Sequence, residues 1–267
     1  YWLHYGNDLM IYDPGTETSY WRRVSDVSGG SRPGNGCTRL PTYDAKRKVT
    51  WFFATVGSGP YMPGLPDTPY GYFQYNIEKD IFTHIPFKAN PAGAIAQNCF
   101  MIWLPDFDCA VYPMEKNTVI LDFATSSVIV KPSPDTPGRV SAYERLAYLT
   151  SKKVLLRIAP VATGKTSPTK PAEALDVKDM VGKNNIYWLE DKNEKLWKEQ
   201  CLKTYFYDPA ANTWKDLNLP LNPPYRNCKY GLTYDEKNDV AILVGGQISW
   251  NGPSCNDIWI FDVKKNK

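Results

Sequence analysis

Apolar and polar residues alternate along most of this chain in short segments, and the segments recur in a fixed order. Residues 204–220 contain an alternating segment, a polar turn and a second segment that begins at Trp214. Residues 70–86 repeat this order, with Phe82 in the place of Trp214. Alternation is typical of half-buried strands, and a short apolar run is typical of a strand buried on both faces. Together these segments predict a repeating unit of four strands, which we call a, b, c and d in chain order. Five further segments fit parts of this unit: 37–57, 99–114, 117–132, 142–159 and 228–246.

An aromatic residue followed by Asp or Asn ends many of these segments. The Asp or Asn side chain is expected to accept hydrogen bonds from backbone N–H groups of the next turn, while the ring packs between sheets. A unit of about 40 to 50 residues with four strands is the signature of a propeller blade. The pairs are Tyr12-Asp13, Tyr75-Asn76, Tyr207-Asp208 and Phe261-Asp262.

The last two units resemble the kelch repeat family. The resemblance is carried by Gly245-Gly246 at the end of a b strand, by Asn256-Asp257 with Trp259 in the next strand, and by the segment from Tyr207 to Trp214. Middle units lack the double glycine. The resemblance covers nearly the whole chain and implies an all-β fold, a β-propeller of four-stranded kelch-like blades. A propeller fold implies no single function.

About five blades are represented. The first has strands b, c and d, three are complete, and the last has strands a, b and c, so the first and last are incomplete. We expect one propeller over residues 1–267 as part of a longer chain, with closure as five blades as the alternative. A b–c segment is inserted at about 160–202. It carries Trp188 and Trp197, and loops of this length are usually functional or disordered.

Composition narrows the classes of partner. The chain has 267 residues, 43% of them hydrophobic and 14% aromatic, which suffices for a large core. The net charge of +3 comes from well-mixed residues, so nucleic acid is not an expected partner. No apolar run is long enough for a membrane span. We expect a secreted or otherwise extracytoplasmic protein.

The six Cys support two interpretations. None lies in CxxC spacing, and five fall at starts of a or c strands, on one rim. They are either small buried residues or the source of one or two disulfides, with Cys228 bonded to Cys201 or Cys255. The only two His are His4 and His84, so no metal or cofactor is expected.

Catalytic patterns are weak. Gly164-Lys165-Thr166 echoes a P-loop but lacks the upstream glycine, and G-x-S-x-G is absent. Asp106 and Asp108 fall in a predicted hairpin turn, where Asp is favoured for backbone reasons. Kelch-type copper oxidases need two convergent His, whereas His4 and His84 belong to different strands. The sequence therefore assigns no catalytic residue and favours a non-catalytic role.

The d–a and b–c loops of a propeller share one face, and here they are rich in aromatic and basic residues. Such residues anchor protein or sugar recognition. We predict a recognition or scaffold module that binds protein or glycan through this face. The alternatives are loops that only pack on each other, a lyase, hydrolase or oxidase with its site at the channel mouth, and a structural subunit of a larger assembly with further domains or subunits. The predicted binding residues are Arg32, Tyr61, Arg139, Trp188, Tyr225, Arg226 and Trp250.

Overall fold

The structure is a computed structural model, and it describes most of the predicted strands. The described residues are 2–4, 8–13, 15–23, 41–52, 71–88, 101–114, 116–137, 145–160, 202–224, 226, 230–247 and 254–267. They form strands, turns and connecting segments, and no helix occurs among them.

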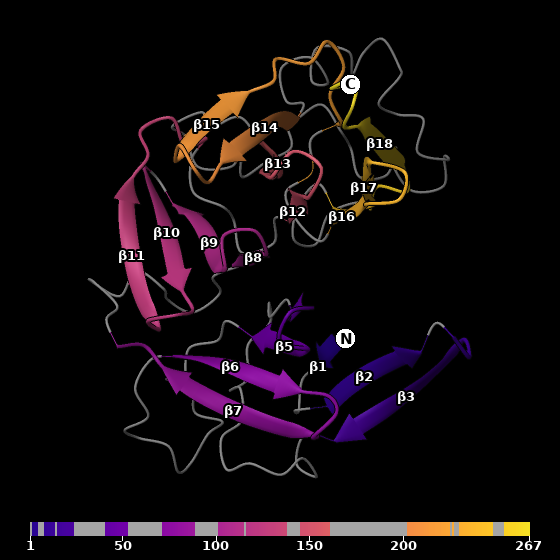
Figure 1. The fold of residues 1–267 in the computed structure, drawn as a ribbon. Coiled ribbons are helices and arrows are strands. Elements are labelled where there is room, and N and C mark those ends of the chain that lie inside the picture. Colours follow the sequence, from indigo (N-terminus) through magenta and orange to yellow (C-terminus); the bar gives the residue numbers. More distant parts are fainter. Residues whose placement is uncertain are drawn as a thin grey trace. The chain divides into compact units, whose positions relative to one another are not determined.

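The strands form five antiparallel sheets, named A to E here in chain order (Figure 1). Sheets B, C and D have four strands, and sheets A and E have three. Sheet A contains β1 (Trp2–His4), β2 (Asp8–Asp13) and β3 (Thr18–Arg23); sheet B contains β4 (Pro41–Asp44), β5 (Val49–Phe52), β6 (Gly71–Asn76) and β7 (Ile81–Pro86). Sheet C contains β8 (Ile102–Leu104), β9 (Cys109–Met114), β10 (Asn117–Asp122) and β11 (Ser127–Pro132). Sheet D contains β12 (Leu146–Leu149), β13 (Val154–Pro160), β14 (Leu202–Asp208) and β15 (Thr213–Asp216), and sheet E contains β16 (Gly231–Asp235), β17 (Val240–Val244) and β18 (Ile258–Asp262).

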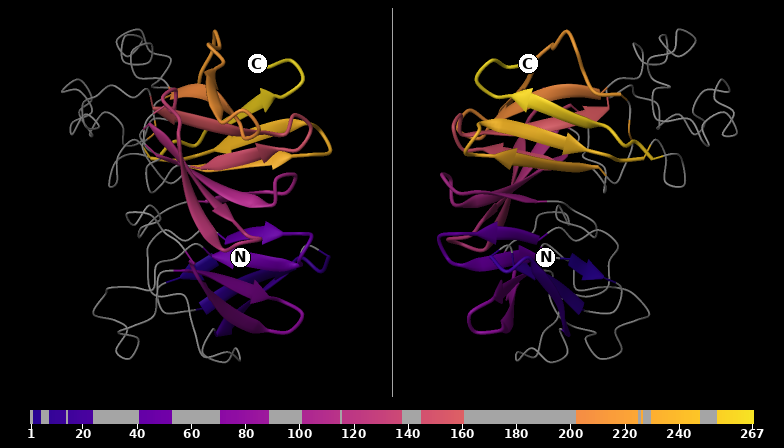
Figure 2. Two further views of the ribbon diagram at one scale, coloured as in Figure 1. Left: turned by 60° about the vertical axis from the view of Figure 1, so that its left-hand side comes forward. Right: turned by 90° about the vertical axis from the view of Figure 1, so that its right-hand side faces the viewer.

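Within every sheet the strands lie side by side in chain order (Figure 2). This up-and-down order is that of propeller blades, and the fold class is an all-β β-propeller, as predicted. Three complete sheets between two three-stranded ones confirm the expected succession of strands. Pro160 of β13 and Leu202 of β14, which flank the predicted insertion, pair with each other.

Contacts divide the chain into two compact units. Unit 1 comprises residues 1–112 and 119–131, and unit 2 comprises residues 113–118 and 132–267. In unit 1, β4 contacts β8, and in unit 2, β12 contacts β16. Sheets B and C therefore meet through their first strands, and so do sheets D and E, as neighbouring blades do. The organisation of residues 1–267 as one propeller stays a prediction.

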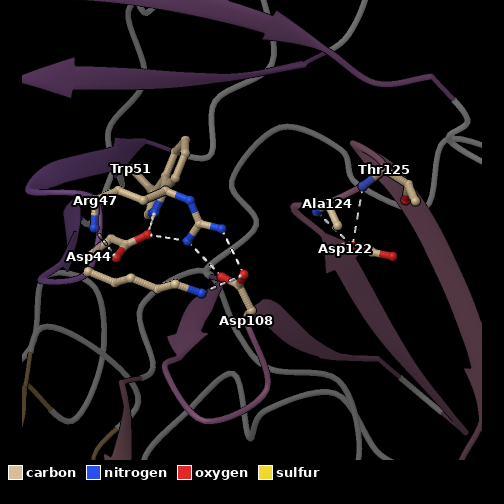
Figure 3. A network of polar contacts seen from close by, with 8 residues as sticks. Asp44, Arg47, Trp51, Asp108, Asp122, Ala124 and Thr125 are labelled. Atoms are coloured by element: carbon tan, nitrogen blue, oxygen red, sulfur yellow. Dashed lines mark hydrogen bonds and ion pairs between the residues drawn. The ribbon is translucent and has the colours of Figure 1, made fainter.

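Four hairpin turns share one hydrogen-bond pattern, and it confirms the predicted backbone bonding of the Asx residue in three of the aromatic–Asx pairs. Asp208 Oδ1 accepts hydrogen bonds from the N–H groups of Ala210 and Ala211, at 2.8 and 3.1 Å. Asp122 does the same in sheet C (Figure 3). Asn76 and Asp262 each accept one such bond. These side chains replace the backbone partners that a tight turn cannot supply.

A second kind of hydrogen bond closes three hairpin turns from the other side. A Tyr hydroxyl donates to the carboxylate or amide oxygen five residues later, which lies in the left-handed region where Asp and Asn are tolerated best. The pairs are Tyr75 to Asp80 (2.6 Å), Tyr207 to Asn212 (2.9 Å) and Tyr234 to Asp239 (2.7 Å), with acceptor φ values of 54°, 54° and 55°. The sequence pattern did not reveal this bond.

Second strands were predicted to be buried on both faces. This is confirmed for β13, where Leu155 to Ala159 are all buried. It is wrong for β17, where Ala241 and Leu243 are buried but Val244 is 45% exposed. Only the face of β17 that carries Ala241 and Leu243 packs on sheet D. The cluster formed there includes Leu156, Ile158 and Phe261.

Candidate functional site

The described ends of three connections are bonded to one another at one end of unit 2. The connections are residues 161–201 within sheet D, 217–230 between sheets D and E, and 245–257 within sheet E; we call this end the loop face. The N–H of Leu202, where the first connection ends, donates to the carbonyl oxygen of Pro223 in the second, at 2.9 Å. The bases of these two connections are therefore bonded to each other.

Arg226 ties the second connection to the third. Its side chain is fully buried, and its Nη1 and Nη2 donate to Oδ1 and Oδ2 of Asp257 at 3.1 and 2.7 Å. Nη1 also donates to the carbonyl oxygen of Gly245 at 2.6 Å, and Nε donates to that of Pro224 at 3.2 Å. A planar guanidinium with several donors suits such a two-pronged contact. We call the Arg226–Asp257 pair the loop clamp.

The carboxylate of Asp257 is stabilised in its charged form. Burial on its own raises the pKa of Asp257, but hydrogen bonds from Arg226 and from the indole N–H of Trp259, together with the charge of Arg226, leave that pKa below its ordinary value. Asp257 is therefore charged at neutral pH.

The double glycine shapes the base of the third connection. Gly245 and Gly246 have φ values of 60° and 115°, which L side chains rarely adopt. A Cβ on Gly245 would also lie 3.3 Å from the carbonyl oxygen of Cys255. The N–H of Gly245 donates to Asp257, that of Cys255 donates to Gly246, and Gln247 pairs with Ser254. Residues 248–253, with Trp250, thus leave from a fixed hairpin base.

Only two of the residues predicted for binding or disulfides are described. Arg226 belongs to the loop clamp, and Cys255 is 5% exposed at the base of the third connection. Its candidate partner Cys228, and Cys201 as the alternative partner of Cys228, are not among the described residues, within which no disulfide is found, so the pairing stays a prediction. The remaining predicted binding residues also lie outside the described ranges: Arg32, Tyr61, Arg139, Trp188, Tyr225 and Trp250.

The sequence did not identify Asp257 as the partner of Arg226. Asp257 stands in the Asn256-Asp257 motif, which indicated a blade but gave no sign of an arginine partner 31 residues earlier. The burial of Arg226 was missed for the same reason. Tyr225 directly precedes Arg226 in the chain, so the loop clamp holds the residue next to this predicted binding residue.

A second polar cluster lies in unit 1 (Figure 3). Arg47, in the turn between β4 and β5, donates to Asp44 at 2.7 Å and to both oxygens of Asp108 at 2.6 and 2.8 Å. Asp108 belongs to the turn between β8 and β9, as predicted from its sequence, so Arg47 joins sheets B and C. Trp51 and Lys46 donate to Asp44 and Asp108 respectively. Hydrogen bonding to Asp108 raises the pKa of Arg47, despite the opposing effect of burial. Each charge has a partner, which indicates a structural cluster.

The surroundings of His84 indicate a structural role for this side chain. It lies on β7 with its ring 4.9 Å from that of Phe73, and burial lowers its pKa. Within the described ranges, no three His, Cys, Asp or Glu residues are grouped so that they could hold a metal ion. The same residues include no helix long and apolar enough to cross a membrane.

Comparison with known proteins leaves the fold as the basis for any assignment. No protein-family model matches the chain, and no curated protein matches it. The order of the strands and the contacts between sheets support one conclusion, which is the fold class. It is a β-propeller of four-stranded blades.

Proposed function

We propose that the chain is a non-catalytic recognition module that binds a protein partner through the loop face of unit 2. The observation that carries this proposal is the loop clamp. Arg226 and Asp257 fix the bases of two connections that hold Tyr225 and Trp250, two of the aromatic residues predicted to bind. Aromatic anchors lose less entropy on binding when the loops that carry them are held in advance.

A protein is favoured over a glycan by the polar groups at the loop bases. Sugar recognition needs polar side chains that point at the ligand, whereas Arg226 bonds Asp257, Gly245 and Pro224. Hydrogen bonds from Arg226 and Trp259 occupy the carboxylate of Asp257. The second and third connections are rich in Pro, Gly and aromatic residues, a composition suited to an apolar protein contact.

The blades are proposed to be kelch-like. The double glycine at the end of β17 has the positive φ values that only glycine adopts easily, and Trp259 on β18 bonds the Asp of the Asn256-Asp257 motif. These contacts give a physical reason for the residues on which the resemblance depends.

The test is quantitative affinity capture from the source material, with Trp250→Ala and Tyr225→Ala as variants. Loss of a central aromatic anchor costs about 2 kcal/mol or more, so the captured partner should fall by roughly 30-fold. Tyr20→Ala is the matched control, because Tyr20 is an aromatic residue 53% exposed on β3 of sheet A. Capture that is equal for all variants would contradict the proposal. A glycan-array signal lost in the same two variants would replace the protein partner with a glycan.

A further inference from the structure

The outer edge of β18 in sheet E is paired with no other strand in the described part of the chain. The inner edge of β18 pairs with β17, where the N–H of Gly245 donates to Asp257 and the N–H of Val263 donates to Asp239. Because backbone groups alternate in direction along an antiparallel strand, Ile258, Ile260 and Asp262 direct theirs to the outer edge.

Asp262 already has a partner on this outer edge. Its N–H donates to the carbonyl oxygen of Lys267 at 2.7 Å, and the N–H of Lys267 lies 3.4 Å from the carbonyl oxygen of Asp262. This reciprocal pair spans a turn that ends with Asn266, whose φ is 52°. Such a pair is the first rung of an antiparallel hairpin.

Sheet D contains the same rung, and there it is continued by a fourth strand. Asp208 pairs with Thr213, five residues later, and the next pair joins Tyr207 to Trp214. Trp214 is 6% exposed, and its ring lies 5.0 Å from that of Tyr207. Asp262 and Lys267 have the same separation, so Phe261 in sheet E is equivalent to Tyr207.

A cavity borders Phe261 and Lys267, the residues next to which the counterpart of Trp214 would lie. Its volume is about 280 Å³, and it is lined mostly by apolar side chains, including Ile158, Leu219, Leu221 and Phe261. A cavity on the order of 150 Å³ accommodates a benzene ring, so this one has room for a large apolar side chain. Two of the lining residues, Leu221 and Ile260, are 63% and 64% exposed.

We propose that the edge of β18 and this cavity are the site of a fourth strand of the same polypeptide. The strand enters directly from the turn before Lys267, and its second residue is an apolar side chain that packs beside Phe261. Sheet C supports this residue type, because the second residue of its fourth strand is Val128, which is 3% exposed. This inference does not depend on the proposed function of the loop face.

The test extends the chain after Lys267 with the sequence of β15 from its aromatic residue onward, Trp-Lys-Asp-Leu-Asn-Leu. The matched control carries Ser in place of that Trp. Hydrogen exchange, followed by NMR or mass spectrometry, reports on the amides of Ile258 and Ile260. We expect their exchange to slow at least tenfold with the Trp extension, and the midpoint of thermal unfolding to rise relative to the Ser control.

Two results would overturn the inference. One is equal exchange of these amides in the chain without an extension and in both extended forms. The other is protection that appears without any extension and grows with protein concentration, since it would identify a second copy as the occupant of β18. Partner capture through Trp250 is a separate measurement, so this inference and the proposed function fail independently.

Discussion

Arg226 and Asp257 form a bidentate ion pair in which one partner is fully buried and the other is 30% exposed at its side chain. This asymmetry makes Asp257 the residue on which the pair depends, because a buried guanidinium without its carboxylate is an uncompensated charge.

We therefore expect Asp257→Asn to lower the free energy of unfolding by about 2 to 4 kcal/mol, slightly under the full penalty for a completely buried pair. Urea denaturation followed by far-UV circular dichroism measures the change. Asp216→Asn is the control, since Asp216 pairs with Lys203 at the surface and such pairs contribute about 0 to 1 kcal/mol. Equal effects of the two substitutions would show that Arg226 does not depend on Asp257.

The same pair predicts a dependence of stability on pH. The pKa of Asp257 in the folded chain is below the ordinary value of 3.8. A lowered pKa stabilises the fold fully above the unfolded value, and this contribution is lost as the pH falls through the folded value. Unfolding midpoints measured from pH 6 down to pH 2 should therefore fall most below about pH 4. In the Asp257→Asn variant, the fall of the unfolding midpoint below about pH 4 should be smaller.

In unit 1, Arg47→Met should cost about 3 kcal/mol, because Asp44 is fully buried and loses its cationic partner. Arg47→Lys should recover only part of this, since an ammonium group cannot contact both oxygens of Asp108 as the guanidinium does. A double-mutant cycle with Asp108→Asn measures the coupling. Additive effects would argue against a bridge between sheets B and C.

Lys116 offers a stabilising substitution. It has a φ of 57° and an exposed side chain, in the turn between β9 and β10. A left-handed conformation costs a residue with a side chain about 1 kcal/mol. Lys116→Gly keeps the conformation without this cost, so the midpoint of thermal unfolding should rise slightly. Lys116→Ala retains the strain and should bring no gain, which separates backbone strain from the loss of the charge.

Cys109 should react slowly with thiol reagents. Burial, followed by the nearby charges of Asp122 and Asp108, raises its pKa to about 11. Compared with a thiol of pKa 9, its thiolate fraction near pH 8 is lower by about 100-fold, and thiolate is the reacting form. Timed alkylation with peptide mass spectrometry measures the rate at this site, and urea-unfolded protein gives the reference rate. Equal rates in folded and unfolded chain would contradict the assignment.

The sequence sufficed for the strands and turns because their determinants are local. Alternation, turn residues and aromatic–Asx pairs lie within a few positions of each other, as Tyr207, Asp208 and Asn212 illustrate. The role of Arg226 depends on Asp257, in another connection, and no local pattern encodes that distance. The exposure of Val244 likewise depends on which sheet covers its face, which is a property of packing.

The order of the strands has a consequence for the way the chain folds. Most hairpins in the sheets close through a short turn, so most native pairings form between residues near each other in the chain and should form fast. Residues 53–70 separate β5 from β6, and residues 245–257 separate β17 from β18. The longest separation is that of β13 from β14, by residues 161–201. Closing a longer loop costs more entropy, so we expect sheet D to complete its pairing late, and the loop face to assemble only after that step.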